Sequence, residues 1–175
     1  MYKGKSAIVQ MPTSAGKTRA TEMVIRSAFL SGRTSLAVIV APYKALCHEI
    51  KDNLLEEFRN EQVNIDELTD ILQADFDMTE ILGAKQIIVV TPEKLLFVLR
   101  NSPEMAQHIG LLIYDEGHQF DDRERGINYE LLITSLKSMV PTEIQTLLIS
   151  SPPSKSGCQN HPLLLISICE KNGLF

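Results

Sequence analysis

The segment from Met11 to Thr18, Met-Pro-Thr-Ser-Ala-Gly-Lys-Thr, has the residue types of a phosphate-binding loop. Gly16 lets the backbone turn so that successive N–H groups face one ligand, and Lys17 can reach the outer phosphates. The hydroxyl of Thr18 is a suitable ligand for Mg²⁺. The segment therefore predicts a magnesium–triphosphate site formed by Thr13, Ser14, Ala15, Gly16, Lys17 and Thr18.

The sequence around this segment supports the prediction. The apolar run Ala7–Gln10 precedes it and predicts a strand, and a helical pattern follows it up to Leu30. Gly-Lys-Thr alone could be an ordinary helix start, but a strand before it and a helix after it favour the phosphate loop.

A second group of reactive side chains follows the apolar run Leu111–Tyr114. Asp115 and Glu116 come directly after this run, where the strands of parallel sheets bind ligands. Asp115 would hold Mg²⁺, directly or through water, and Glu116 would orient and deprotonate an attacking water molecule. A solvated Asp-Glu pair is the alternative, and the phosphate loop upstream disfavours it.

His118 follows the two acids, and its role stays open. It could couple the acids to the end of a later strand at Ser150-Ser151, or be an ordinary loop histidine. The other histidines lack the spacing that would complete a metal site with it.

Composition places the chain among globular proteins of one domain. It has 175 residues, of which 44% are hydrophobic. Its net charge of −5 disfavours general polyanion binding and leaves only local contacts with nucleic acid.

The three cysteines of the chain lack metal-ligand spacing and favour a reducing compartment. No apolar run reaches membrane-spanning length and no signal peptide begins the chain, so we expect a cytoplasmic protein without a membrane partner.

Short apolar runs alternate with longer helical patterns, which predicts an α/β fold with a mostly parallel sheet and helices on both faces. The predicted strands are 7–10, 36–41, 87–91, 111–114 and 145–150, and the predicted helices are 17–30, 43–59, 92–100 and 126–139, with Thr91 as an N-cap. The alternation in 63–68 indicates an edge strand, and 77–82 suggests a short helical turn. We expect one domain over 1–151 and an atypical tail over 152–175.

Four segments occur in the order and spacing of known motifs: Met11–Thr18, Ala41–Leu46, Thr91–Leu95 and Asp115–His118. In this respect the chain resembles the first RecA-like domain of superfamily 2 helicases, the DEAD/DEAH-box group, and within it the Ski-like type. The resemblance covers about residues 5 to 151. It implies ATP and Mg²⁺ as cofactors and a P-loop fold of the RecA-like kind.

The resemblance also implies a partner, a single strand of DNA or RNA. Its sugar-phosphate backbone would lie against Pro42, Tyr43, Lys44, Thr91 and Pro92. A helix start behind Thr91 offers N–H groups and partial positive charge to a phosphate, and Lys44 adds a full charge. A plain helix start is the alternative, and Arg33 and Lys94 could be further contacts or solvated surface.

The chain departs from the family pattern at several positions. The third motif, usually Ser-Ala-Thr, is Ser150-Ser151-Pro152, which puts in doubt the link between ATP hydrolysis and strand movement. Gly117 replaces the more usual Ala, a change expected to preserve the geometry of the strand end. No second RecA-like lobe follows, so the arginine fingers of the family are missing.

These departures lead to two alternative functions. The first is the ATP-binding half of a nucleic-acid-dependent ATPase or helicase, completed by a second lobe or a partner subunit. The second is a non-catalytic fragment that binds nucleotide or nucleic acid without turnover. The ends of the sequence favour a truncation or a frameshift near Pro152, and the alternative is a naturally short protein.

Overall fold

The computed structural model describes residues 4–12, 16–68, 84–117, 125–139 and 144–151. Within these ranges the chain forms a six-stranded sheet in which every pair of neighbouring strands is parallel. The strand order is β1-β6-β5-β2-β4-β3. The strands are β1 (Ala7–Gln10), β2 (Leu36–Val40), β3 (Val63–Glu67), β4 (Lys85–Val90), β5 (Ile109–Tyr114) and β6 (Gln145–Ser150).

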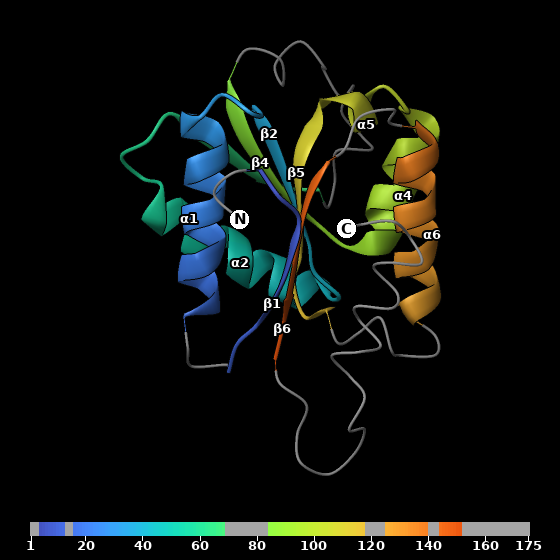
Figure 1. Ribbon diagram of the computed structural model, residues 1–175, viewed down its shortest axis with the longest axis horizontal. Coiled ribbons are helices and arrows are strands. Elements are labelled where there is room, and N and C mark those ends of the chain that lie inside the picture. Colours follow the sequence, from blue (N-terminus) through green and yellow to red (C-terminus); the bar gives the residue numbers. More distant parts are fainter. Residues whose placement is uncertain (1–3, 13–15, 69–83, 118–124, 140–143, 152–175) are drawn as a thin grey trace.

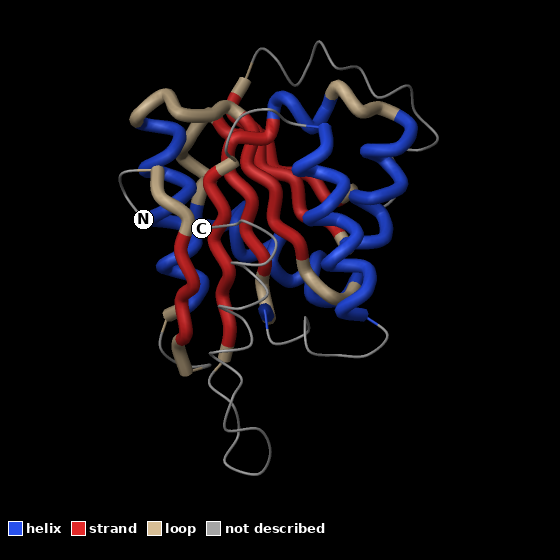
Figure 2. Tube along the Cα trace, turned by 45° about the vertical axis from the view of Figure 1, so that its right-hand side comes forward, coloured by secondary structure: helices blue, strands red, loops and turns tan. Residues whose placement is uncertain are grey.

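Helices cover both faces of the sheet (Figures 1 and 2). One face carries α1 (Lys17–Leu30) and α2 (Lys44–Glu57). The other carries α4 (Pro92–Asn101), α5 (Met105–His108) and α6 (Arg125–Met139). The predicted α/β fold with a parallel sheet between two helical layers is therefore confirmed. No helix in the described ranges is long and apolar enough to cross a membrane.

The apolar runs become central strands because both of their faces are buried. Along β2 every residue is buried, and alternate side chains enter different cores. Ala37 and Ile39 pack with α1 and α2, whereas Val38 and Val40 pack with α4 and α6. This alternation fixes the register of the strand, because a slip of one residue would exchange the two sets of side chains.

The predicted bounds of β1, β6 and α1 agree with the structure, and β3 lies at the edge as expected. β4 starts earlier than predicted, because the polar residues Lys85 and Gln86 pair with β3. The short helix α5 was not predicted. The predicted turn over 77–82 and the tail over 152–175 lie outside the described residues.

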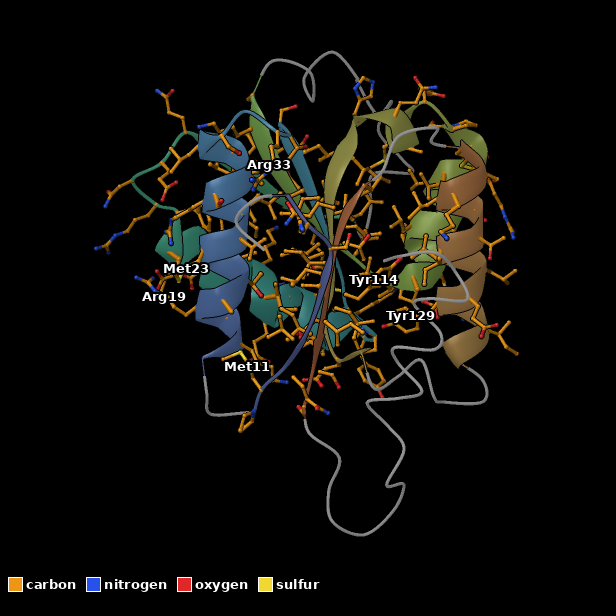
Figure 3. All side chains as sticks on the ribbon, in the orientation of Figure 1. Met11, Arg19, Met23, Arg33, Tyr114 and Tyr129 are labelled. Carbon is orange, nitrogen blue, oxygen red and sulfur yellow. The ribbon has the colours of Figure 1, made fainter. Side chains whose placement is uncertain are left out.

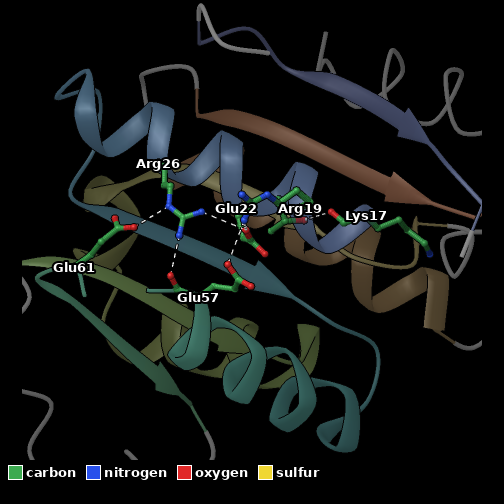
Figure 4. A network of polar contacts seen from close by, with 7 residues as sticks. Lys17, Arg19, Glu22, Arg26, Glu57 and Glu61 are labelled. Atoms are coloured by element: carbon green, nitrogen blue, oxygen red, sulfur yellow. Dashed lines mark hydrogen bonds and ion pairs between the residues drawn. The ribbon is translucent and has the colours of Figure 1, made fainter. Parts of the chain in front are cut away.

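A network of charged side chains joins α1 to the end of α2 (Figure 4). The carboxylate of Glu22, whose residue is only 2% exposed, accepts hydrogen bonds from Arg19 at 2.7 Å and from Arg26 at 3.2 Å. Arg26 also donates to Glu61 at 2.8 Å, and its guanidinium lies 4.4 Å from the ring centroid of Phe58. The hydrogen bond to Glu61, together with the negative charges of Glu61 and Glu22, raises the pKa of Arg26 above its ordinary value. The network holds α1 against the chain that leads into β3.

Candidate functional site

The candidate site lies at the end of the sheet where the C-terminal ends of the parallel strands meet. Because β1, β6 and β5 are neighbours, the residues that follow them come together although they are distant in sequence. The backbone N–H of Met11 donates to the carbonyl of Ser150 at 3.0 Å and extends the pairing of β1 with β6. The N–H of Asp115 donates to the carbonyl of Val40 at 2.9 Å, which ties the end of β5 to β2. The acids therefore follow a firmly paired strand end.

Gly16 and Lys17 form the start of α1. Gly16 has a φ of +83°, a left-handed conformation that favours glycine, and it is the N-cap residue of the helix. Gly16 has no side chain with which to cap this helix start, and the first turn of α1 contains no acidic residue. The start of α1 can therefore bind an anion through its backbone N–H groups and the side chain of Lys17. Thr18 is exposed in the same turn, whereas Thr13, Ser14 and Ala15 lie outside the described residues.

Lys17 contacts the residues that follow β5 and β6. Its Nζ atom lies 2.9 Å from Oε1 of Glu116 and donates to Oγ of Ser151 at 2.7 Å. The Lys17 side chain is 11% exposed and that of Glu116 is 24% exposed, so the ion pair is partly shielded from water. The structure thus joins the predicted phosphate-loop lysine to the predicted catalytic acid across 99 residues of sequence.

The backbone at Glu116 turns sharply. Its φ of +52° lies in the left-handed region, which a residue with a side chain seldom adopts. The backbone N–H of Glu116 donates to Oδ1 of Asp115 at 3.0 Å. Strained residues of this kind are concentrated at functional sites.

The two serines after β6 differ in their surroundings. Ser150 is 0% exposed, and its hydroxyl donates to the carbonyl of Ser151 at 3.0 Å. The hydroxyl of Ser151 instead lies among the charged side chains of Lys17 and Glu116. The sequence placed the coupling role at the strand end Ser150-Ser151 and named Ser150 as the site residue, whereas the contacts with Lys17 and Glu116 are made by Ser151. His118 lies outside the described residues.

Gly117 packs directly against β6. An added Cβ at this position would lie 2.2 Å from Cδ2 of Leu148 and 3.3 Å from the carbonyl oxygen of Ile149. Leu148 is itself 0% exposed, so its side chain has little room to move. An alanine here would have to displace the Leu148 side chain, and the expectation that glycine preserves the geometry of the strand end stays a prediction.

The residues predicted to contact nucleic acid lie at the same end of the sheet, after β2 and β4. Pro42 is buried, whereas Tyr43 is 46% exposed and Lys44, the first residue of α2, is also exposed. Thr91 is the N-cap residue of α4, as predicted, and Pro92 begins the helix. The side chain of Thr91 makes no capping hydrogen bond. Because β2 and β4 are neighbours, the five residues share one end of the sheet.

Arg33 does not join this group. It precedes β2, so it lies at the opposite end of the sheet from Met11, as Figure 3 shows. Its guanidinium donates to the hydroxyl of Ser27 at 3.3 Å. Lys94 lies in the first turn of α4, near Thr91.

The described residues contain no group of three or more His, Cys, Asp or Glu side chains that could hold a metal ion. Asp115 and Thr18 supply one carboxylate and one hydroxyl. This donor set suits Mg²⁺, which is commonly held by one or two protein ligands together with water and phosphate oxygens. The chain's own residues therefore fit magnesium bound together with a nucleotide.

Comparisons with known proteins place the chain in a family. The model of the family described as DEAD/DEAH box helicase matches residues 1–160. The chain is 33% identical to the ATP-dependent DNA helicase Hel308 of Methanocella arvoryzae over 86% of its own length and 20% of the helicase. It is 31% identical to the Hachiman protein HamB of Bacillus cereus over 78% of the chain and 12% of HamB.

A further relative is a plant protein, the DExH-box ATP-dependent RNA helicase DExH13 of Arabidopsis thaliana, with 29% identity over the whole chain and 8% of the relative. The chain therefore spans a fifth or less of the length of these three relatives.

Proposed function

This chain belongs to the DEAD/DEAH box helicase family, and on that premise we propose that it is the ATP-binding lobe of a nucleic-acid-dependent ATPase. The observation that carries the proposal is the contact of Lys17 with Glu116 at 2.9 Å. It brings a cation at a helix start and an acid at a strand end into one site. The helicase names of the relatives support the class of reaction.

ATP with Mg²⁺ would supply the phosphoanhydride bond and the metal charge at this site. Lys17 and the N–H groups at the start of α1 would bind the phosphates. The carboxylate of Asp115 and the hydroxyl of Thr18 would hold the metal ion. Glu116 would accept a proton from the attacking water, which its carboxylate can do only after Lys17 has turned toward the phosphates.

Hydrolysis at a useful rate requires a second lobe. In this reaction class an arginine finger stabilises the charge that develops on the transferred phosphate and contributes a factor of about 10³–10⁵ to the rate. We propose that a second RecA-like lobe, in the same longer protein or in a partner subunit, supplies this group. The isolated chain should then bind nucleotide and hydrolyse it slowly.

A single strand of DNA or RNA is the proposed partner. Tyr43 and Lys44 follow β2 and are exposed, and Thr91 follows β4. The first-turn N–H groups of α2 and α4 can donate to phosphates, which would give contacts without sequence preference. The relatives include both a DNA helicase and an RNA helicase, so the test includes both single-stranded DNA and single-stranded RNA.

The test measures ATP hydrolysis by the purified 175-residue chain, with and without single-stranded DNA and RNA. We expect slow turnover that rises with nucleic acid and is lost in Lys17→Ala and Glu116→Gln. Glu116→Gln should keep its affinity for Mg–ATP, because the amide removes only the proton acceptor. Binding without turnover in the wild-type chain would support the non-catalytic alternative. A lack of nucleotide binding would reject the ATPase, and a lack of binding to both nucleotide and nucleic acid would reject both functions.

A further inference from the structure

Ser151 lies between Lys17 and Glu116 in the candidate site. Its Oγ atom accepts a hydrogen bond of 2.7 Å from Lys17 and lies 3.5 Å from Oε2 of Glu116. Lys17 also contacts the other carboxylate oxygen of Glu116, so the three side chains form a closed ring. The residues are separated by up to 134 positions in sequence, and the ring joins the ends of β5 and β6 to the start of α1.

The chemistry of a hydroxyl gives each contact a direction. An ammonium group only donates and a carboxylate only accepts, whereas a hydroxyl does both. Lys17 therefore donates to Ser151, whose single proton points to Glu116. Both contacts are charge-assisted and partly buried, and the contact with Lys17 is the stronger because it is 2.7 Å long against 3.5 Å for the contact with Glu116. In the third motif as described above, position 151 is usually Ala, which has no hydroxyl to offer.

We propose that Ser151 is a positioning residue of the ATP site. In the free protein its hydroxyl holds the ammonium of Lys17 on Glu116 and away from the phosphates. When a nucleotide draws Lys17 away, the same hydroxyl keeps its proton on Glu116 and holds the carboxylate in place for the attacking water. This inference rests on the proposed ATP-binding function.

The proposal gives binding and turnover opposite responses to one substitution. Ser151→Ala removes a contact that competes with the phosphates for Lys17, so nucleotide binds about threefold to tenfold more tightly, the range that one hydrogen bond accounts for. The same substitution leaves Glu116 less well oriented, so any turnover falls. A local unfolding of the site would instead weaken both.

The first measurement needs no nucleotide. The full chain is treated with a small excess of acetic anhydride, and the modification of Lys17 is followed by mass spectrometry with the exposed Lys44 as an internal reference. We expect the modification of Lys17 to rise about threefold or more in Ser151→Ala and to stay at the wild-type rate in Ser151→Thr, which keeps the hydroxyl. Ser138→Ala, which removes an exposed hydroxyl on α6, is the matched control.

The second measurement is the affinity of the same four proteins for a fluorescent ADP. Tighter binding in Ser151→Ala alone supports the proposal. Unchanged affinity together with unchanged modification of Lys17 overturns it while leaving the proposed function intact. If no variant binds nucleotide but modification rises only in Ser151→Ala, the contact in the free protein stands and the proposed function fails.

Discussion

At Gly117, next to the proposed catalytic residue Glu116, the packing leaves no room for a Cβ atom. Its missing side chain leaves space that Cδ2 of Leu148 fills, with an added Cβ only 2.2 Å away. Glu116 directly before it holds a φ of +52°. Close packing at Gly117 and a left-handed backbone at Glu116 therefore occur at adjacent residues.

We expect Gly117→Ala to lower the free energy of unfolding by about 1–3 kcal/mol, because overpacking a filled core displaces side chains. The measurement is urea unfolding, carried out in the wild-type and the Leu148→Ala backgrounds. In the second background the added methyl meets only the carbonyl of Ile149 at 3.3 Å, so its cost should nearly disappear. Equal costs in the two backgrounds would show that the contact with Leu148 is not the cause.

The site residues could be predicted from sequence to the extent that each follows a recognisable run. Lys17, Asp115 and Glu116 stand at the ends of apolar patterns, and their residue types indicate their chemistry. The role of Ser151 could not be found this way. Its significance depends on the closure of β1 on β6, which brings its hydroxyl within 2.7 Å of Lys17.

Among the elements, α1 connects the candidate site to the end of α2. Its start carries Lys17 and its middle carries Glu22, whose buried carboxylate is held by Arg19 and Arg26. The carboxylate of Glu61, by contrast, is 41% exposed at the other side of Arg26. The two acids share one arginine and differ in burial, so they form a matched pair for mutation.

Glu22→Ala should lower the free energy of unfolding by about 1–3 kcal/mol, because it leaves a gap in the packing and removes the buried partner of two arginines. Glu61→Ala should change it by less than about 1 kcal/mol, since water solvates an exposed ion pair. Urea unfolding of the two variants, with m-values compared, tests this difference. Equal losses would mean that burial of Glu22 contributes nothing to the strength of the network.

The elements themselves were largely predictable from hydrophobic patterns. The five strands other than β3 have nearly continuous apolar runs, and α1 begins and ends where its pattern does. α5 was missed because four residues are too few for a helical period to appear. β4 begins with polar residues, Lys85 and Gln86, whose pairing with β3 is a tertiary effect that no local pattern contains.

For the molecule as a whole, the core between α2 and the sheet contains a titratable reporter. Cys47 is 1% exposed and packs with residues of β2 and β4. Burial, together with the negative charge of Glu67, raises the pKa of its thiol to about 12. The folded protein therefore keeps this thiol protonated, and a thiolate forms at ordinary pH only when the core opens.

We expect Cys47 to react with a thiol reagent only through unfolding, in a chain whose Cys158 and Cys169 are replaced by Ser. The rate at low urea should follow the equilibrium population of the unfolded state measured by circular dichroism. Because the folded pKa lies above the unfolded one, the thiol's contribution to stability is complete below about pH 9 and is lost as the pH rises towards 12. Fast labelling of the native protein would contradict the burial.

The pairing of β1 with β6 has a consequence for synthesis on the ribosome. The first described strand finds its partner only among residues 147–150, after all the other described strands have been made. Contacts so distant in sequence form slowly, and an apolar strand that waits for its partner is open to association with other chains. Lys17 follows that waiting strand and Ser151 follows its partner, so the nascent chain acquires its candidate ATP site in the last step of folding and cannot engage nucleotide through the full site before then.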